Sequence, residues 1–395
     1  MAPEPVLAAG TRTPLGVFGG ALRDVAMTDL AAHAARACLE RAGLPATAVD
    51  HIVFATTVPS DRDSLFAPRV VGMKAGLSET AGALGVTRAC ASGLQSMLSA
   101  HEQVTSGHSR LALAGGAESY SRAPYVVTTM RWGHKRGSQS LEDMLEWAYR
   151  CPFSLEYMGE TAENLAAEFQ YTRDAMDEWG AMSQARAIAA TESGFLARQI
   201  APIEIPDGRK QRRVSEDEGP RRDATREKLA TLKPVFREGG KVTAGSSSLV
   251  NDGAAFLLVG DRQAFTEHGV TAEARIVDWS VIGVPARIMG HGPVPAIGKL
   301  LERTRLRIED IDYFEINEAF AVVNLHAERQ LGIPRDRHNL YGGGISIGHP
   351  PAVTGLRMAM TAINHLADTR GRYAILSMCL GAGQGMAMLI ENLRR

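Results

Sequence analysis

The chain lacks the features that would place it in several common protein classes. Its 395 residues carry 43 Lys and Arg against 44 Asp and Glu, a net charge of −1. A nucleic-acid-binding protein needs a surplus of basic residues, so this balance argues against a nucleic-acid partner. No uninterrupted apolar run reaches the ~18 residues that a membrane-spanning helix requires, and we expect no membrane partner either.

Cysteine is also scarce, and its spacing argues against disulfides and metal sites. The four cysteines, Cys38, Cys90, Cys151 and Cys379, lie far apart and form no CxxC pair. Structural zinc sites and disulfide scaffolds use closely spaced cysteines, so we expect free thiols and no metal. The first ten residues resemble neither a signal peptide nor an Arg-rich presequence, which predicts a soluble cytoplasmic protein.

What the chain does have is an ordinary globular composition with abundant glycine. Apolar residues make up 45% and charged residues 22%, values that are typical of folded domains. The 40 glycines indicate many tight turns and close backbone contacts. At roughly 150 residues per domain, the length predicts two or three domains.

A sequence repeat indicates how these domains are organised. The segment Leu39–Leu44 recurs as Leu301–Leu306, 262 residues later. The same offset aligns two further pairs of segments, which are 92–95 with 354–357 and 110–114 with 372–376. Chance similarity between alanine- and leucine-rich helices is the alternative, but the register never slips, which favours a duplicated chain.

Each copy predicts the same series of elements. Periodic apolar positions indicate helices, and β-rich runs indicate strands. The predicted elements are helices 30–42 and 296–304, strands 51–55 and 313–316, second helices 94–104 and 350–366, and strands that end in glycines at 115–116 and 381–383. Helices that alternate with apolar strands predict an α/β fold in which both faces of the sheet are covered.

Between the two copies lies a stretch of different character, about residues 120–245. It contains three of the four tryptophans and the charged run Asp207–Arg226, and its sequence over 162–198 predicts a helix. We interpret this stretch as an inserted domain or a long lid. Strand-like sequence resumes over Val242–Val259.

Two residues that precede predicted helices could carry chemistry. Cys90 comes before an amphipathic helix, whose positive end favours the reactive thiolate, although a small buried residue is the alternative. His349 lies in the glycine-rich segment 342–350. It could serve as a base for a thiol, or it could simply cap a loop.

Two further candidates follow predicted strands. Cys379 ends a strand and opens a glycine turn, the place where α/β folds bind ligands, although a buried thiol is again the alternative. This turn does not fit a P-loop, because no Lys-Ser or Lys-Thr follows it. Asn317 could open a helix, a position where Asn caps the helix without any functional role.

The duplication connects these four residues. Cys90 belongs to the first copy, and the other three belong to the second. At the offset of 262, the aligned pairs are Cys90 with Ala352, His349 with Thr87, and Cys379 with Ala117. Two related halves packed face to face could therefore bring different groups to one asymmetric cleft.

Motifs along nearly the whole chain together resemble the thiolase family. The main motifs are Cys90–Leu94, Asn317–Phe320, Gly348–Pro350 and Cys379–Gly381. Further similar segments are Arg12–Gly16, Phe18–Gly20, Ala114–Ser119, Val242–Gly245, Asn251–Gly253 and Met289–Pro293. The resemblance implies a thiolase-like α/β fold with two duplicated halves in layered α-β-α-β-α packing and an inserted loop domain.

The resemblance also implies domain limits. Residues 1–120 plus 242–268 would form the N-terminal half, and residues 269–395 the C-terminal half. Residues 121–241 would form the loop domain, which carries coenzyme A in this family.

The implied reaction is reversible Claisen condensation and thiolysis of acyl-CoA thioesters, as in an acetyl-CoA C-acetyltransferase or a 3-ketoacyl-CoA thiolase. Cys90 would hold the acyl group, His349 would take its proton, and Cys379 would act as acid and base at the α-carbon. One oxyanion hole would use His349 and a water held by Asn317. The other would use the backbone N–H groups of Cys90 and Gly381.

The substrates implied are CoA and its thioesters, with no permanently bound cofactor. The residues implied to bind them are Ser248 at the pantetheine arm, Met158 at the acyl pocket, Arg221 (or else Arg222) at the nucleotide, and Phe320. Without the resemblance, the run Arg209–Arg222 reads as a solvated charged loop. Family likeness also implies a homodimer or a homotetramer.

Three departures from the family pattern bear on the pocket. The segment 351–353 lacks the glycine that usually follows Gly-His-Pro, and Ala382 interrupts the final glycine turn. Tyr157 stands where short-chain members usually carry His, which argues against specificity for acetyl groups alone. The alternatives are a condensing acyltransferase with an unusual acceptor and a non-catalytic acyl-CoA- or lipid-binding protein of the same fold.

Overall fold

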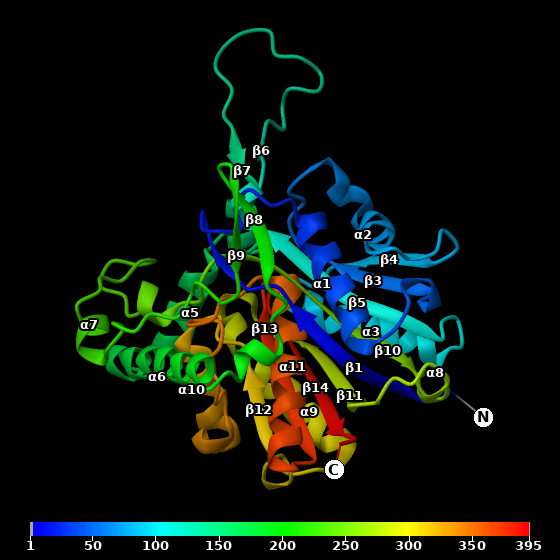
Figure 1. The fold of residues 1–395 in the computed structure, drawn as a ribbon. Helices are drawn as coiled ribbons and strands as arrows, with labels where there is room; N and C mark the ends of the chain where they lie inside the picture. The colour runs from blue at the N-terminus through cyan, green and yellow to red at the C-terminus, as the bar shows by residue number, and fades with distance from the viewer. Residues whose placement is uncertain (1–2, 395) are drawn as a thin grey trace.

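The two copies build one mixed sheet of ten strands that divides into two groups (Figure 1). The computed structural model describes residues 3–394. The first group runs β4 (Gly82–Val86), β3 (His51–Ala55), β5 (Leu111–Ser119), β10 (Asn251–Asp261) and β1 (Pro5–Arg12), with β2 (Gly16–Val17) beside β10. The second group runs β11 (Ala274–Gly283), β14 (Gln384–Asn392), β13 (Tyr373–Leu380) and β12 (Tyr313–Ile316). The groups meet where Leu7 of β1 pairs with Ala274 of β11.

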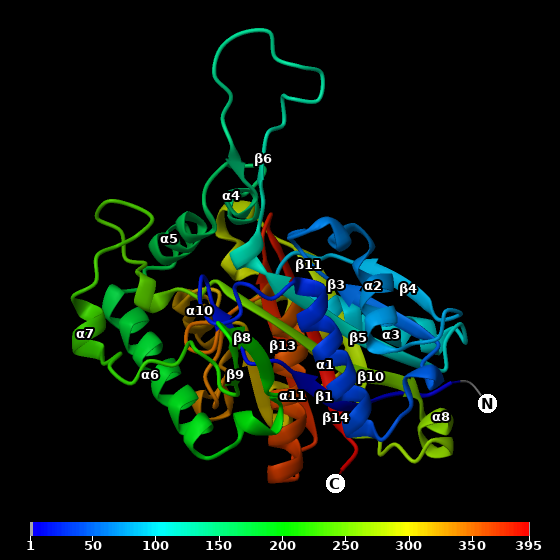
Figure 2. The ribbon, with the colours of Figure 1, turned by 45° about the horizontal axis from the view of Figure 1, so that its top comes forward.

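Helices complete the layers on both sides and in the middle. The outer face of the first group is covered by α1 (Met27–Ala42) and α2 (Ala67–Ala75), and that of the second by α9 (Pro293–Thr304) and α10 (Ala321–Leu331). Between the groups, α3 (Ser92–Thr105) packs against α11 (Pro351–Thr369) (Figure 2). The predicted α-β-α-β-α packing is therefore confirmed. Because it is covered all round, α11 buries nearly its whole length.

The two central helices cross at glycines that occupy equivalent positions of the repeat, Gly93 and Gly355. A Cβ atom on Gly93 would lie 2.8 Å from the carbonyl oxygen of Ala352. One on Gly355 would lie 2.5 Å from the backbone nitrogen of Leu94, and one on Gly116 of β5 would lie 2.2 Å from the same Ala352 oxygen. Side chains at these positions would collide with backbone, so the glycines set how closely the halves approach each other.

Most predicted elements are present, and two strands match to the residue. The predicted strands 51–55 and 313–316 are β3 and β12, and the predicted second helices are α3 and α11. The expectation that Gly115 and Gly116 end their strand is wrong. Strand β5 continues to Ser119 because it pairs with β10 along its whole length.

The inserted segment departs further from its predicted structure. The single helix expected over 162–198 is two helices, α5 (Met158–Glu168) and α6 (Arg173–Glu192). The break occurs because Gln170 adopts a positive φ of 57° and Thr172 caps the second helix by accepting a hydrogen bond from the N–H of Ala175. The capping residue restarts the helix in a new direction.

The charged run expected to be a solvated loop forms in part a hairpin of β8 (Ile203–Asp207) and β9 (Lys210–Val214), which turns at Gly208 with φ 61°. The charged side chains of β9 are exposed, and apolar residues of both strands pack on the core. The strand expected from Val242 begins only at Asn251, because residues 244–246 form a 3-10 turn. The remaining short elements are β6 (Tyr125–Val126), β7 (Glu142–Asp143), α4 (Met144–Tyr149), α7 (Arg226–Ala230) and α8 (Arg262–Glu267).

One long loop projects from the body of the molecule. It joins β6 to β7 and extends away from the layers in both views (Figures 1 and 2). The side chain of Trp132 in this loop is 92% exposed. Across residues 3–394, no helix has both the length and the apolar character needed to cross a membrane.

Candidate active site

Elements from both halves and from the insertion enclose a cavity of about 290 Å³. The predicted site residues that line it are Cys90, Met158, Ser248, Phe320, His349 and Gly381. The wall also includes residues that were not assigned to it from the sequence, namely Thr57, Thr87, Ala89, Tyr120, Ala148, Tyr149, Val250, Met289 and Ala319. Pro351, from the segment that departs from the family pattern, lines it as well. Asn317 and Cys379 do not line this cavity, although both contact or influence residues that do.

Cys90 sits in a tight turn between β4 and α3. Ala89 adopts φ 43°, which is unusual for a residue with a side chain. The hydroxyl of Ser92 fixes the turn, since it accepts from the N–H of Arg88 (2.8 Å) and donates to the carbonyl of Ala89 (2.7 Å). Burial raises the pKa of the Cys90 thiol, while hydrogen bonds from the backbone N–H groups of Gly381 and Cys90 oppose that rise. Two backbone donors therefore point at this sulfur.

The ring of His349 is held by hydrogen bonds that define its protonation. The hydroxyl of Thr354 donates to the carbonyl of Pro350 (2.9 Å), so its oxygen accepts from the Nδ1–H of His349 (2.7 Å). Nε2 therefore carries the lone pair and accepts from the side-chain nitrogen of Asn317 (3.2 Å). Burial, with a smaller contribution from Arg357, lowers the pKa of His349 to about 3. The ring is thus neutral near pH 7, and Nε2 is its basic atom.

The backbone of His349 is fixed from the first half. Asn251 on β10 accepts from the N–H of His349 (3.1 Å) and donates to the carbonyl of Gly16 (3.0 Å). Gly348, at φ 124°, lies against this side chain, and a Cβ atom there would be 2.2 Å from the Asn251 oxygen. The first half therefore positions the histidine that the second half supplies.

Asn317 lies in a loop, and the interpretation that it opens a helix is wrong. Helix α10 begins at Ala321, and Phe320 occupies its cap position. The N–H of Asn317 instead extends the pairing of β12 with β13 by donating to the carbonyl of Ser377 (2.9 Å). Its side-chain oxygen is buried and has no hydrogen-bond partner within residues 3–394. An acceptor beside His349 is thus left for a substrate or solvent donor.

Glu318, which the sequence analysis did not single out, ties the glycine-rich loop to the insertion. Its carboxylate accepts from the side chains of Trp179 (2.9 Å) and Ser183 (2.6 Å) on α6 and from the N–H of Ile345 (3.2 Å). A Cβ atom on Gly343 would lie 2.6 Å from the carboxyl carbon. The glycines before His349 therefore make room for a buried carboxylate that anchors the loop.

Cys379 lies near the end of β13, where it pairs with Gly385 of β14, and is fully buried. Burial raises the pKa of its thiol, and the negative charge of an ionised Cys90 raises it further. The two sulfurs are therefore close enough for charge on one to disfavour ionisation of the other. In the turn that follows, Ala382 adopts φ 66°, so the alanine that interrupts the glycines is held in a strained conformation.

A second buried carboxyl, Glu118, stands beside the cavity. It accepts from the N–H (2.9 Å) and the hydroxyl (2.7 Å) of Thr57 and from the N–H of Ala352 (3.3 Å). Burial nevertheless raises its pKa to about 7. The Thr57 hydroxyl also contacts that of Tyr120 (2.9 Å), whose ring packs edge-on against Tyr149. A charged residue within the apolar strand β5 was the available sequence signal for Glu118.

Three further residues discussed from the sequence lie outside this lining. Arg221 lines a second cavity of about 180 Å³ together with Leu249, the residue that follows Ser248. Arg222 forms an exposed ion pair instead. Tyr157 donates its hydroxyl to a neighbouring glutamate at 2.5 Å. In the part of the chain that the structure describes, no group of three His, Cys, Asp or Glu side chains could hold a metal ion.

Comparison with known proteins extends over both halves and the insertion. Residues 5–263 match the thiolase N-terminal domain, and residues 270–392 match the thiolase C-terminal domain. A beta-ketothiolase of Cupriavidus necator is 40% identical over 395 residues, which cover 100% of both chains. The mitochondrial 3-ketoacyl-CoA thiolase of Bos taurus is 39% identical over 98% of each chain.

Solved structures of similar proteins have the same fold. An acetyl-CoA acetyltransferase of Bacillus anthracis matches with a TM-score of 0.96 and 39% identity over 99% of both chains. Human mitochondrial 3-ketoacyl-CoA thiolase in complex with CoA matches with a TM-score of 0.95 and 37% identity over 99% of this chain and 98% of that one. With both family domains matched end to end, the chain belongs to the thiolase family of acyltransferases.

Proposed function

We propose that this thiolase cleaves 3-ketoacyl-CoA with free CoA, and catalyses the reverse Claisen condensation, through an acyl group carried on Cys90. One observation supports this most strongly. A single apolar cavity is lined by the Cys90 thiol, by His349 with an unprotonated Nε2, and by Gly381, whose N–H points at the sulfur. A nucleophile, a base and an oxyanion donor are the groups that acyl transfer to a thiol needs.

In the first step of thiolysis, Cys90 attacks the 3-keto carbon of the substrate. Nε2 of His349 takes the thiol proton as the S–C bond forms, and the keto oxygen becomes an oxyanion. The N–H groups of Cys90 and Gly381, which already face the sulfur, are the donors proposed for it. Because burial keeps the thiol and the imidazole neutral, proton transfer accompanies the attack.

Collapse of this intermediate breaks the C2–C3 bond. The leaving group is the enolate of acetyl-CoA, and the Cys379 thiol donates its proton to C2. A raised pKa keeps Cys379 protonated until that moment, as a general acid must be. Asn317 and the protonated His349 are proposed as donors to the enolate oxygen, since their side chains already touch at 3.2 Å.

Free CoA completes the cycle. Its thiol gives a proton to the Cys379 thiolate, and its sulfur attacks the carbonyl of the acyl group on Cys90. His349 returns its proton to the Cys90 sulfur as that C–S bond breaks. Every group regains its starting state, and condensation follows the same steps in reverse.

The CoA chain is assigned to a path between the two cavities. Met158 and Phe320 line the first cavity at the acyl end. Ser248 lines it too, while the next residue, Leu249, lines the second. A pantetheine arm that passes Ser248 would bring the nucleotide toward Arg221, whose guanidinium suits a phosphate. Acyl-CoA and CoA are thus the proposed small-molecule partners.

Selectivity for the acyl chain is assigned to residues that line the first cavity beside Cys90. Pro351 lines it next to His349, and the rings of Tyr120 and Tyr149 line it as well. Tyr157 is outside the lining, so its effect on specificity would be indirect. A homodimer or homotetramer and a cytoplasmic location stay predictions.

The test is thiolysis of acetoacetyl-CoA and a series of longer 3-ketoacyl-CoA esters, combined with intact-mass detection of the acyl enzyme. Wild-type protein should cleave at least one ester and gain one acyl mass. Cys90→Ser should lose both, whereas Cys151→Ser, a second free cysteine outside the cavity, should keep both. No cleavage of any ester, or a label that persists in Cys90→Ser, would contradict the proposal.

A further inference from the structure

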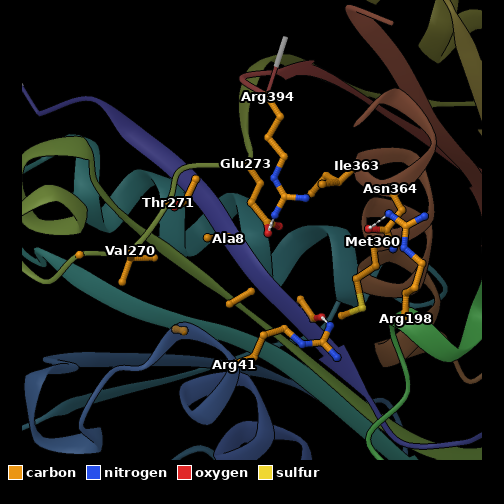
Figure 3. Close-up of a pocket in the computed structure, with 14 residues that line it drawn as sticks. Ala8, Arg41, Arg198, Val270, Thr271, Glu273, Met360, Ile363, Asn364 and Arg394 are labelled. Carbon is orange, nitrogen blue, oxygen red and sulfur yellow. Dashed lines mark hydrogen bonds and ion pairs between the residues drawn. The ribbon is translucent and has the colours of Figure 1, made fainter. Parts of the chain in front are cut away.

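A second large cavity, about 450 Å³, lies where the two halves of the sheet join (Figure 3). Its walls come from β1, the end of α1, the loop after α8, the distal part of α11 and the C-terminal segment. It shares no lining residue with the acyl cavity or with the cavity of Arg221. The proposed thiolase reaction therefore gives this cavity no role.

The lining of this cavity carries more positive than negative charge. Arg41, Arg198 and Arg394 reach it from separate elements, as Figure 3 shows, against a single carboxylate, Glu273. Glu273 pairs with Arg394, and Arg198 pairs outside the lining with Asp368 at 2.6 Å. Burial lowers the pKa of Arg394, and repulsion from the like charge of Arg198 lowers it further.

Arg41 is the cation that the protein satisfies least. Within residues 3–394 its side chain has no carboxylate partner, and it donates instead to the carbonyl oxygen of Gly10 at 2.5 Å. That carbonyl lies in a bulge of β1 between Ala8 and Thr11, where Ala9 adopts φ 56°. The chain thus keeps a strained strand segment beside an arginine whose remaining donors are left for another acceptor.

Apart from these charged residues, the wall is largely apolar, which indicates that the ligand has an organic part. Val270, Met360 and Ile363 present apolar side chains, and Asn364 adds an amide. The volume is far larger than an inorganic phosphate requires. The three guanidinium groups stand on different sides of the space, so a ligand with one compact charge would leave some of them unmatched.

We propose that this cavity binds an organic polyphosphate of the size of a nucleoside diphosphate. Its anionic oxygens would be bound by Arg41, Arg198 and Arg394, and its organic part would lie against the apolar wall. Guanidinium groups form bidentate hydrogen bonds with phosphate oxygens, and they bind it more strongly than neutral donors do.

The experiment is calorimetric titration of the full-length protein with ADP and without CoA, because CoA carries an ADP group and could occupy either site; the arginine variants distinguish this cavity from the active site. Saturable binding of ADP is expected. Arg41→Gln and Arg394→Gln should each weaken it by about tenfold or more, since each removes a charge-assisted contact. Arg36→Gln, on the same helix as Arg41 but outside the cavity, is the matched control and should bind as the wild type does.

Two further ligands test the chemistry of the site. Inorganic pyrophosphate should bind more weakly than ADP, because it cannot use the apolar wall, and citrate should bind more weakly still. The proposal is overturned if ADP does not bind, if the Arg41 and Arg394 variants bind it unchanged, or if either comparison ligand binds as tightly as ADP. All variants should retain thiolysis of 3-ketoacyl-CoA, so the outcome is separate from that of the proposed reaction.

Discussion

The two halves of the chain share a frame and differ at the positions that meet at the acyl cavity. Strands β3 and β12, strands β5 and β13, and helices α3 and α11 correspond at the offset of 262. Thr87 and His349 are equivalent by this offset, and both line the cavity. The other unlike pairs are Ala352 with Cys90, Ala117 with Cys379, and Ala55 with Asn317. One half therefore supplies the proposed nucleophile and the other supplies the proposed base and acid.

Besides the insertion, the halves differ in structure at the outer edge of each sheet. In the first half, β4 pairs in parallel with β3. The equivalent residues 344–348 of the second half form no strand, and they wrap instead around Glu318. A segment that serves as an edge strand in one half thus leads into His349, the proposed base, in the other. A duplicated frame can thus be kept while one of its elements takes a new role.

At the position of the proposed base, the second half can be given the residue that the first half carries. His349→Thr removes the proposed acceptor of the Cys90 proton, and thiolysis should fall by about a thousandfold or more. Circular dichroism and thermal unfolding should stay close to wild type, because Thr87 already occupies the equivalent place. A variant with near-normal kcat would show that another group acts as the base.

Cys379→Ala likewise gives the second half the residue of the first, because Ala117 is the equivalent of the proposed acid Cys379. Thiolysis should fall by about a hundredfold or more, but Cys90 should still accept an acyl group from acetyl-CoA. Exchange of the α-protons of acetyl-CoA with deuterated water, followed by mass spectrometry, should be lost. If acylation of Cys90 disappeared as well, the separate roles given to the two cysteines would be wrong.

Glu118 is a buried ionisable residue, and its equivalent in the second half is the apolar Leu380. Its pKa is raised to about 7 from an ordinary 4.5, so folding favours the protonated form. Below pH 4.5 this preference stabilises the folded protein by roughly 3 kcal/mol, and the stabilisation is lost as the pH rises through 7. Thermal unfolding of Glu118→Gln should depend less on pH over this range than that of the wild type. Equal slopes would contradict the prediction, and Glu40→Gln, an exposed position, serves as control.

The contact between Gly93 and Gly355 lies at a position where the two halves are alike. Gly355→Ala places a methyl group against the backbone of α3 and should lower the free energy of unfolding by about 1–3 kcal/mol. Gly298→Ala, on α9, meets no atom within 4 Å and should stabilise the protein by up to about 1 kcal/mol. Urea unfolding of both variants measures the two changes, and effects of equal sign would show that helix crossing does not depend on Gly355.

The repeat made much of the fold predictable. Strands 51–55 and 313–316 are bounded by polar residues and read as strands in both copies, so their limits agree with the structure. The predicted helix start at Asn317 is wrong, and the reason lies in the tertiary structure. Its neighbours look like a helix start, but its N–H is committed to β13 and its side chain to His349. Local sequence cannot show such distant partners.

Within the site, the residues that lie in motifs were predictable, and those that depend on long-range packing were not. Cys90 and His349 precede predicted helices, and Cys379 ends a predicted strand beside glycines, which are signals that a single sequence carries. Thr57 and Tyr149 reach the cavity from segments with no local pattern. Their place depends on how the insertion folds over the first half, which is a property of the assembled structure.

The contact between Gly93 and Gly355 has a consequence for how a one-sided site can arise. A residue that meets its own counterpart is what a two-fold symmetric interface of identical chains produces. In such a dimer every substitution occurs twice, so a catalytic group placed on one side of the axis appears on the other as well. Joining the halves in one chain removes that constraint. Positions 93 and 355 can stay alike while 87 and 349 differ, and covalent linkage thereby permits one cleft with one complete set of groups.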